Sequence, residues 1–151
     1  MKLRNIALVF LLSITASAAL AKPSPIVNFD HQRIKRFDSK KLSMDEVLKA
    51  IRNAAGQNDW KLEPGDASGH IIATLLIRNM HTAVVEITYS PDEYSIDYKS
   101  SNNLDYKKYP DGKPFIGPNG QLMSGITEVI HPNYNKWVQQ LNDAIYRALQ
   151  D

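Results

Sequence analysis

The sequence predicts a two-layer α+β domain, with two helices on one face of an antiparallel sheet of three to four strands, in the order α-β-β-β-β-α. Apolar residues recur at helical spacing near residues 43–56 and 133–149. Between them, residues 70–78 and 82–89 alternate between apolar and polar side chains, as half-buried antiparallel strands do. Because the apolar face of such a sheet needs a covering layer, we expect the two helices to pack against it.

The first helix begins with a capping pattern. Ser43 can accept a hydrogen bond from the amide of Glu46, whose carboxylate can reach back to the amide of Ser43. Leu42 and Val47 can pack together across this start as a hydrophobic staple. Gly56 is expected to end the helix, because glycine readily adopts the left-handed conformation that follows a last helical turn.

Two long strands follow a short one around Trp60 and Leu62. The apolar pattern favours a register with Leu76 opposite Val84, since a slip of one residue would mix the apolar and polar faces. This register places a loop at residues 79–81. One face of the pair then carries these side chains: Ile71, Ala73, Leu75, Ile77, Ala83, Val85, Ile87 and Tyr89.

The next strand begins at Tyr94, after a turn over residues 90–93. Tyr94 is expected to lie opposite Tyr89 as an aromatic cross-strand pair. Residues 100–103 are polar and are expected to form a turn. The last helix starts at Pro132, where the missing amide of proline costs no helical hydrogen bond.

Two segments lie outside this framework. Residues 22–41 are a polar lead-in that is expected to be partly extended, and residues 42–151 form the single domain. Residues 107–129 contain three prolines and four glycines, which predicts an inserted loop within that domain. Four apolar side chains are candidates to pin this loop to the body: Phe115, Ile116, Leu122 and Met123.

Residues 1–21 have the pattern of a cleavable secretory signal. Lys2 and Arg4 precede an apolar run at residues 6–12, and Ala19-Leu20-Ala21 forms an A-x-A cleavage pattern. The run is shorter than the roughly 20 apolar residues that span a bilayer. We therefore expect cleavage after Ala21, no transmembrane anchor afterwards, and a periplasmic or secreted protein.

Charge and cysteine content exclude several classes of protein. The chain has 18 basic and 16 acidic residues, and loss of Lys2 and Arg4 with the signal makes these numbers equal. A broad basic face for nucleic acid is therefore not expected. The chain has no cysteine, which excludes disulfide bonds and the lipid-bearing cysteine of a bacterial lipoprotein.

Two segments carry a resemblance. They are residues 94–104 (YSIDYKSSNNL) and residues 130–141 (IHPNYNKWVQQL), the second with an H-x-N-Y-N-x-W pattern at a helix start. Both resemble an uncharacterised family of small exported bacterial envelope proteins and lipoproteins. The resemblance covers about residues 44–149, with 107–129 as an insertion. It implies a one-domain envelope protein and no particular activity.

Motifs for catalysis or metal binding are absent from the sequence. His70 and His81 fall at opposite ends of the predicted hairpin, roughly 30 Å apart at about 3.3 Å per residue, and no H-x-x-x-H spacing occurs. We therefore expect neither a metal site nor a cofactor. The chain lacks a cysteine and a G-x-S-x-G turn, so an enzyme is not favoured. A small hydrolase would need one of three loop serines to meet a histidine: Ser100, Ser101 or Ser124.

The start of the last helix is the first binding candidate. Four side chains crowd it, and the neighbouring turn is expected to add two more: His131, Asn133, Tyr134 and Asn135, with Asn102 and Asn103. One interpretation is a small binding site for a carboxylate or a glycan, since free helix amides also favour an anion. The other is that Tyr134 belongs to the core while the polar side chains satisfy the helix end.

The outer face of the sheet is the second candidate. Ile72, Leu76 and Val84 form an apolar trio there among polar residues, and such a patch can bind a partner. The lead-in or the loop at residues 107–129 is an equal candidate to cover it. The unpaired edge of the last predicted strand offers a third site, where a partner can add a strand.

Together these observations favour a non-enzymatic periplasmic or secreted binding or accessory protein. Its expected partner is another envelope component, either a protein or the cell wall. A secreted inhibitor or effector that acts on an external target is the second hypothesis. A small hydrolase is the third.

Overall fold

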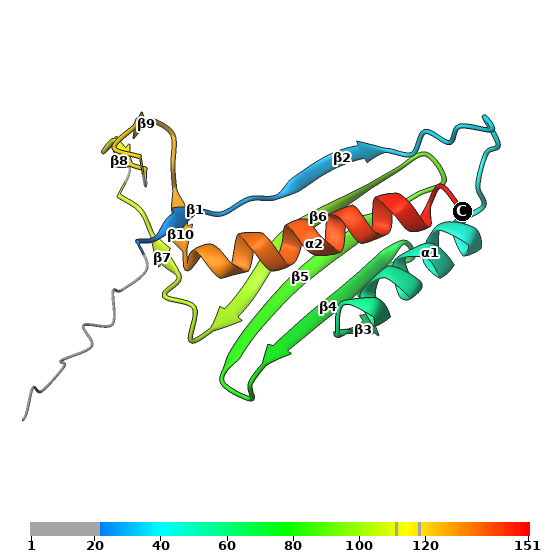
Figure 1. Cartoon of the computed structure of the whole chain (residues 1–151), viewed down its shortest axis with the longest axis horizontal. Helices are drawn as coiled ribbons and strands as arrows, with labels where there is room; N and C mark the ends of the chain where they lie inside the picture. Colours follow the sequence, from blue (N-terminus) through cyan, green and yellow to red (C-terminus); the bar gives the residue numbers. More distant parts are fainter. Residues whose placement is uncertain (1–21, 111, 118) are drawn as a thin grey trace, which may run out of the picture.

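The computed structural model describes residues 22–110, 112–117 and 119–151, so the expected signal segment lies outside the described part of the chain (Figure 1). The elements are, in chain order, β1 (Ser24–Pro25), β2 (Phe29–Arg33), α1 (Met44–Gln57), β3 (Trp60–Pro64), β4 (His70–Ile77), β5 (His81–Tyr89), β6 (Glu93–Asn102), β7 (Lys107–Lys108), β8 (Phe115–Ile116), β9 (Leu122–Met123), β10 (Glu128–Ile130) and α2 (Pro132–Ala148). The protein is therefore α+β, as the sequence predicts. Neither described helix is long and apolar enough to cross a membrane.

The central sheet has five antiparallel strands in the order β2-β6-β5-β4-β3, one more than the largest number expected. The additional strand is β2, which comes from the lead-in and pairs with β6 through Phe29 opposite Ile96. Residues 93–96 of β6 are therefore paired with β2, and the prediction of an unpaired edge is wrong for this part of the strand. Alternating apolar residues were too few in the lead-in to reveal this pairing.

The register of the central hairpin differs from the prediction by two residues. Leu76 lies opposite Thr82, and Thr74 is the residue opposite Val84. A shift of two keeps every side chain on its predicted face, because side chains alternate with a period of two. The inner-face pattern was therefore correct, but the loop lies at residues 78–80. Tyr89 does lie opposite Tyr94.

Both helices cover the inner face of the sheet (Figure 1). Fully buried side chains from each layer meet there: Val47 and Ile51 of α1, Val138, Leu141 and Ile145 of α2, and Val85, Ile87 and Ile96 of the sheet. The buried Tyr94 hydroxyl donates to Asn142 Oδ1 at 2.9 Å, which joins β6 to α2. This bond satisfies one buried polar pair across the two layers, whereas the hydroxyl of Tyr134, also in the core, has no hydrogen-bond partner among the described residues.

The predicted start of α1 agrees with the structure, whereas its predicted end does not. Ser43 and Glu46 form the reciprocal capping box that the sequence predicts. Gly56 does not end α1, which continues to Gln57, and the left-handed residue after the helix is Asp59 with φ 59°. The short polar side chain of aspartate tolerates this conformation, so glycine is not required there.

Two other predicted loops contain strands. Residues 100–102 continue β6 opposite Thr82, Ala83 and Val84, after a register shift, so only Asn103 keeps a turn conformation, with φ 59°. In and next to residues 107–129, β10 pairs with β1 on one side and with β7 on the other in a small sheet, and β8 pairs with β9 as a hairpin. Four apolar side chains were expected to anchor this loop to the rest of the domain. Phe115 is buried, whereas Ile116 and Leu122 are exposed and Met123 is half-buried.

Candidate functional site

A pocket of about 320 Å³ lies where the end of the β4–β5 hairpin meets the start of α2. We call it the helix-start pocket. Segments far apart in the sequence line it: Ile77, Arg78, His81, Leu104, His131, Asn133 and Trp137. Small-ligand pockets usually have volumes of roughly 300–1,000 Å³, so this one suits a ligand of a few linked groups.

Hydrogen bonds fix the two imidazole rings of this pocket. His81 Nδ1 lies 2.7 Å from the carbonyl of Asn103, which can only accept, so His81 carries a proton on Nδ1. His131 Nδ1 accepts from the amide of Asn133 at 3.2 Å. Neutral His131 therefore carries its proton on Nε2, which remains available as a donor. The amide of His131 donates to the carbonyl of Leu104 at 2.9 Å and ties the two walls together.

The hairpin turn brings a cation to the pocket. Arg78 and Asn79 have φ values of 51° and 54°, as the two central residues of primed hairpin turns do. Met80 N donates to Ile77 O at 3.0 Å and closes this turn. The Arg78 guanidinium forms no ion pair with any described residue. The pocket is therefore rich in donors and carries a cation without a protein counter-charge.

The structure divides the predicted helix-start cluster. His131 and Asn133 line the pocket. Asn103 supports its wall in two ways: its carbonyl accepts from His81, and its side-chain amide donates a hydrogen bond to Met80 O at 3.3 Å. Asn102 is an exposed residue of β6 and does not line the pocket. The start of α2 lies beside the residue that follows the predicted turn, because His131 N donates to Leu104 O.

Tyr134 and Asn135 have structural positions instead. Tyr134 is fully buried, its ring meets Tyr98 edge-on at 5.5 Å, and burial raises the pKa of its hydroxyl. The Asn135 side chain accepts from Val27 N at 3.1 Å and donates to Ser24 Oγ and Pro25 O at 2.9 and 2.8 Å. The cluster is therefore divided between the two interpretations. His131 and Asn133 line a pocket, whereas Tyr134 belongs to the core and Asn135 holds the N-terminal segment.

Arg78 and His81 are pocket residues that sequence reasoning missed. The predicted register put His81 in the loop and Arg78 at the end of a strand. In the observed register, His81 lies opposite Ile77, and the turn that follows Ile77 faces the start of α2. The available signal was the Arg-Asn pair itself, because asparagine tolerates the positive φ that a hairpin turn needs.

The apolar trio lies on the open face of the sheet. Leu76 is 48 % exposed, and Ile72 and Val84 are half-buried among polar neighbours. The lead-in does not cross this face, because β2 pairs with the edge of β6. The β8–β9 hairpin stands beyond the end of the sheet, beside β1 and β10 (Figure 1). The two coverings that the sequence suggested are therefore not placed over this trio.

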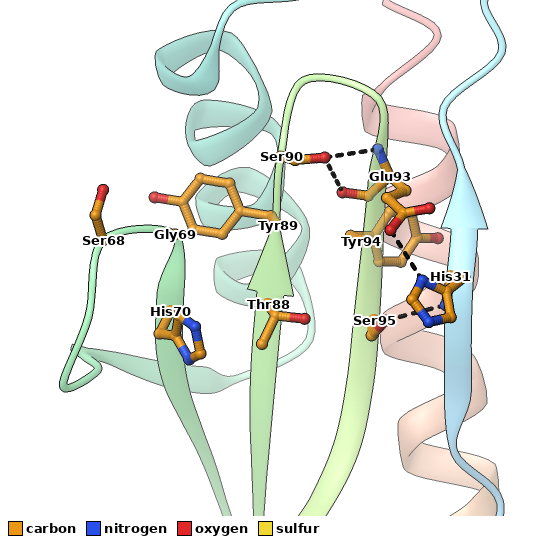
Figure 2. Close-up of a pocket in the computed structure, with 10 residues that line it drawn as sticks. All are labelled: His31, Ser68, Gly69, His70, Thr88, Tyr89, Ser90, Glu93, Tyr94 and Ser95. Carbon is orange, nitrogen blue, oxygen red and sulfur yellow. Dashed lines mark hydrogen bonds and ion pairs between the residues drawn. The ribbon is translucent and has the colours of Figure 1, made fainter.

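A second, polar pocket of about 220 Å³ lies at the other end of this open face. Figure 2 shows His70, Thr88, Ser95 and His31 on four neighbouring strands, on the side away from the helices. His31 Nδ1 lies 2.8 Å from a carboxylate oxygen of Glu93. These residues form a row of imidazole and hydroxyl groups across the sheet.

This polar pocket does not contain a catalytic triad. Ser95 Oγ accepts from the backbone amide of His31 at 3.0 Å, and the structure shows no hydrogen bond from a serine hydroxyl to a histidine ring among residues 22–110, 112–117 and 119–151. A serine nucleophile needs such a contact for activation. The geometry therefore offers no support for the hydrolase hypothesis.

Carboxylates gather beside this pocket. Burial first, and then the neighbouring Asp30 and Glu86, raise the pKa of Asp97 above its usual range. In the part of the chain that the structure describes, one group of three side chains has the spacing of metal ligands: Asp66, His70 and Glu86. The prediction of no metal site rested on the spacing of histidines alone. Groups that combine a histidine with carboxylates were not part of it. The register error hid this group, because it placed Glu86 opposite Thr74 rather than Ile72.

Comparisons with known proteins add no relative. The chain matches no family model, no curated protein and no solved structure. The resemblance to small exported envelope proteins therefore stays an expectation, and a functional argument depends on the geometry of the chain itself.

Proposed function

We propose that this protein is an exported, non-enzymatic binding protein of the bacterial envelope, and that the helix-start pocket is its ligand site. The observation that carries the proposal is the convergence of Arg78, two histidines and Trp137 on one pocket. The signal pattern of residues 1–21 supports export. The absence of a serine–histidine contact in the described residues favours binding over hydrolysis.

The lining of the pocket favours an acidic glycan fragment. A carboxylate pairs well with a guanidinium, and such charge-assisted hydrogen bonds are stronger than neutral ones. The remaining donor of His131 and the side-chain amide of Asn133 suit oxygen acceptors of the same ligand. Trp137 is half-buried and offers an aromatic surface for the apolar face of a sugar ring. The proposed ligand is therefore a wall-derived sugar that carries a carboxylate.

Tryptophan fluorescence tests this proposal directly. Soluble, carboxylate-bearing wall fragments are titrated into the purified protein, and we expect a saturable change in emission from Trp137. Arg78→Ala should weaken binding about tenfold or more, because hydrogen bonds to charged groups contribute about 1.5–3 kcal/mol. Arg52→Ala removes an exposed arginine of α1 and is the matched control.

Two results would count against the site. One is that no acidic wall fragment binds the wild-type protein. The other is that Arg78→Ala and Arg52→Ala bind with equal affinity. Export is tested separately, by N-terminal sequencing of the protein recovered from periplasm and medium. A mature chain that begins at Lys22 is expected, whereas an intact Met1 in a cytoplasmic fraction contradicts export.

A further inference from the structure

We propose that Asp66, His70 and Glu86 form a binding site for a divalent transition metal, with zinc as the ion that best suits their donors. The site lies on the open face of the sheet and is separate from the helix-start pocket. One imidazole nitrogen and two carboxylate oxygens are common zinc ligands, whereas magnesium and calcium prefer oxygen alone.

The distances suit a shared ion. His70 Nδ1 lies 3.2 Å from Glu86 Oε1 and 3.9 Å from Asp66 Oδ1, and all three donor atoms lie within 4.8 Å of one another. Two ligand atoms in a tetrahedral zinc shell are roughly 3.3 Å apart, given bond lengths of about 2.0–2.1 Å. His70 and Glu86 already meet this spacing. The Asp66 side chain is 90 % exposed and has the freedom to move closer.

The backbone places these three donors by separate means. Glu86 lies opposite Ile72, so it is a diagonal neighbour of His70 on the same sheet face. Asp66 belongs to the β3–β4 loop, which Gly65 N closes by donating to His70 O at 3.0 Å. A Cβ on Gly65 would lie 2.6 Å from His70 Cβ, so a larger residue there would push the loop away from His70. The tight loop therefore holds Asp66 beside the imidazole.

The second oxygen of Glu86 has its own partner. Lys99 Nζ lies 3.5 Å from Oε2, whereas Oε1 faces His70. The lysine thus orients the carboxylate without occupying the oxygen that the ion would use. Partners of this kind fix ligand geometry in known metal sites.

The neighbouring polar pocket supplies space on the open side of the proposed ion. His70 belongs to the proposed site and also lines this pocket, together with Ser68 and Thr88 (Figure 2). Three protein ligands leave at least one position of a zinc shell for water or an added ligand. His31 does not complete the site, because the three strand spacings between β2 and β4 separate it from His70 by roughly 14 Å. The geometry thus points to an exposed site with an exchangeable position.

Zinc titration tests the site, with zinc chloride as the probe and isothermal calorimetry at pH 7 as the measurement. We expect one zinc equivalent to bind the wild-type protein. His70→Ala and Glu86→Gln should each weaken binding at least about tenfold, the scale that even outer-shell partners of metal sites reach. Asp66→Asn should have a smaller effect, because Asp66 is the most exposed ligand.

Matched histidine variants separate this site from general zinc binding. His31→Ala and His81→Ala should bind zinc as the wild-type protein does. NMR of the wild-type imidazole nitrogens gives a readout that needs no variant, and zinc should shift the His70 signals most. The proposal is overturned if wild-type protein binds no zinc, if His70→Ala binds equally well, or if the largest shifts fall on another histidine.

Discussion

At the scale of single residues, His31 has a backbone conformation that is uncommon for any residue other than glycine. Its φ is 47°, and it lies where the pairing of β2 with β6 changes register. Bulges of this kind redirect a side chain. Here the ring meets Glu93, and the hydrogen bond with that carboxylate is the main cause that raises the pKa of His31.

Glu93→Gln is therefore expected to lower the pKa of His31, measured by NMR titration of its ring protons. A raised pKa means that the folded protein holds this proton more tightly than the unfolded chain does. The stabilisation is complete below about pH 6.5, the ordinary pKa of histidine, and disappears as the pH rises through the raised value. Both side chains are exposed, so the effect on stability should be small. Glu63→Gln is the control, and an equal shift there would contradict the assignment.

At the scale of the elements, α2 holds the beginning of the described chain through one side chain. The three hydrogen bonds of Asn135 reach Ser24, Pro25 and Val27, and β1 also pairs with β10. Because β1 has two residues and each net hydrogen bond contributes about 1 kcal/mol, Asn135 supplies much of the local stability of this segment.

Asn135→Ala should free this N-terminal segment without unfolding the domain. Hydrogen exchange at the amide of Val27 should become at least about tenfold faster, since its acceptor is lost and local opening governs exchange. The amide of Ile87, at the centre of the sheet, should keep its protection. Asn133→Ala changes an exposed asparagine of the same helical turn and should leave Val27 unaffected. Unchanged exchange at Val27 in Asn135→Ala would show that the strand pairing alone holds β1.

Sequence patterns predicted some of these elements and missed others. Periodicity predicted both helices, the central hairpin and its inner face, because burial of one face leaves a regular apolar spacing. It did not predict β2, whose pairing depends on a strand that lies about 60 residues later. It also missed the register by two residues, since both alternatives bury the same side chains.

The candidate site was predictable in part for the same reason. His131 and Asn133 were found because they are close in sequence and lie at a helix start. Arg78 and His81 join them only through the fold, and so do Asp66, His70 and Glu86. Contacts between distant segments leave no local pattern in a single sequence.

At the scale of the whole molecule, one apolar layer between the sheet and the helices supplies most of the stability. Ile87 is fully buried at the centre of this layer, and its partners on neighbouring strands are Ile71 and Ile96. The opposite face of the sheet is open, so a side chain there contributes little to the folding of the monomer. The two faces should therefore respond differently to truncation.

Ile87→Ala should lower the free energy of unfolding by about 2–5 kcal/mol, because the surrounding core cannot collapse fully around the missing atoms. Leu76→Ala, on the open face, should change it by no more than about 0.5 kcal/mol. Urea unfolding followed by circular dichroism measures both values. Equal losses would mean that the open face is buried in solution, for example against a second copy of the chain.

The position of the lead-in also bears on how the chain folds. The pairings of Ser24 with Ile130 and of Phe29 with Ile96 join residues that are distant in sequence, which raises the contact order and slows folding. Until β2 docks, β6 presents an open edge, and open edges recruit strands from other chains. A chain that emerges N-terminus first must therefore carry residues 24–33 unpaired until its later strands and last helix arrive.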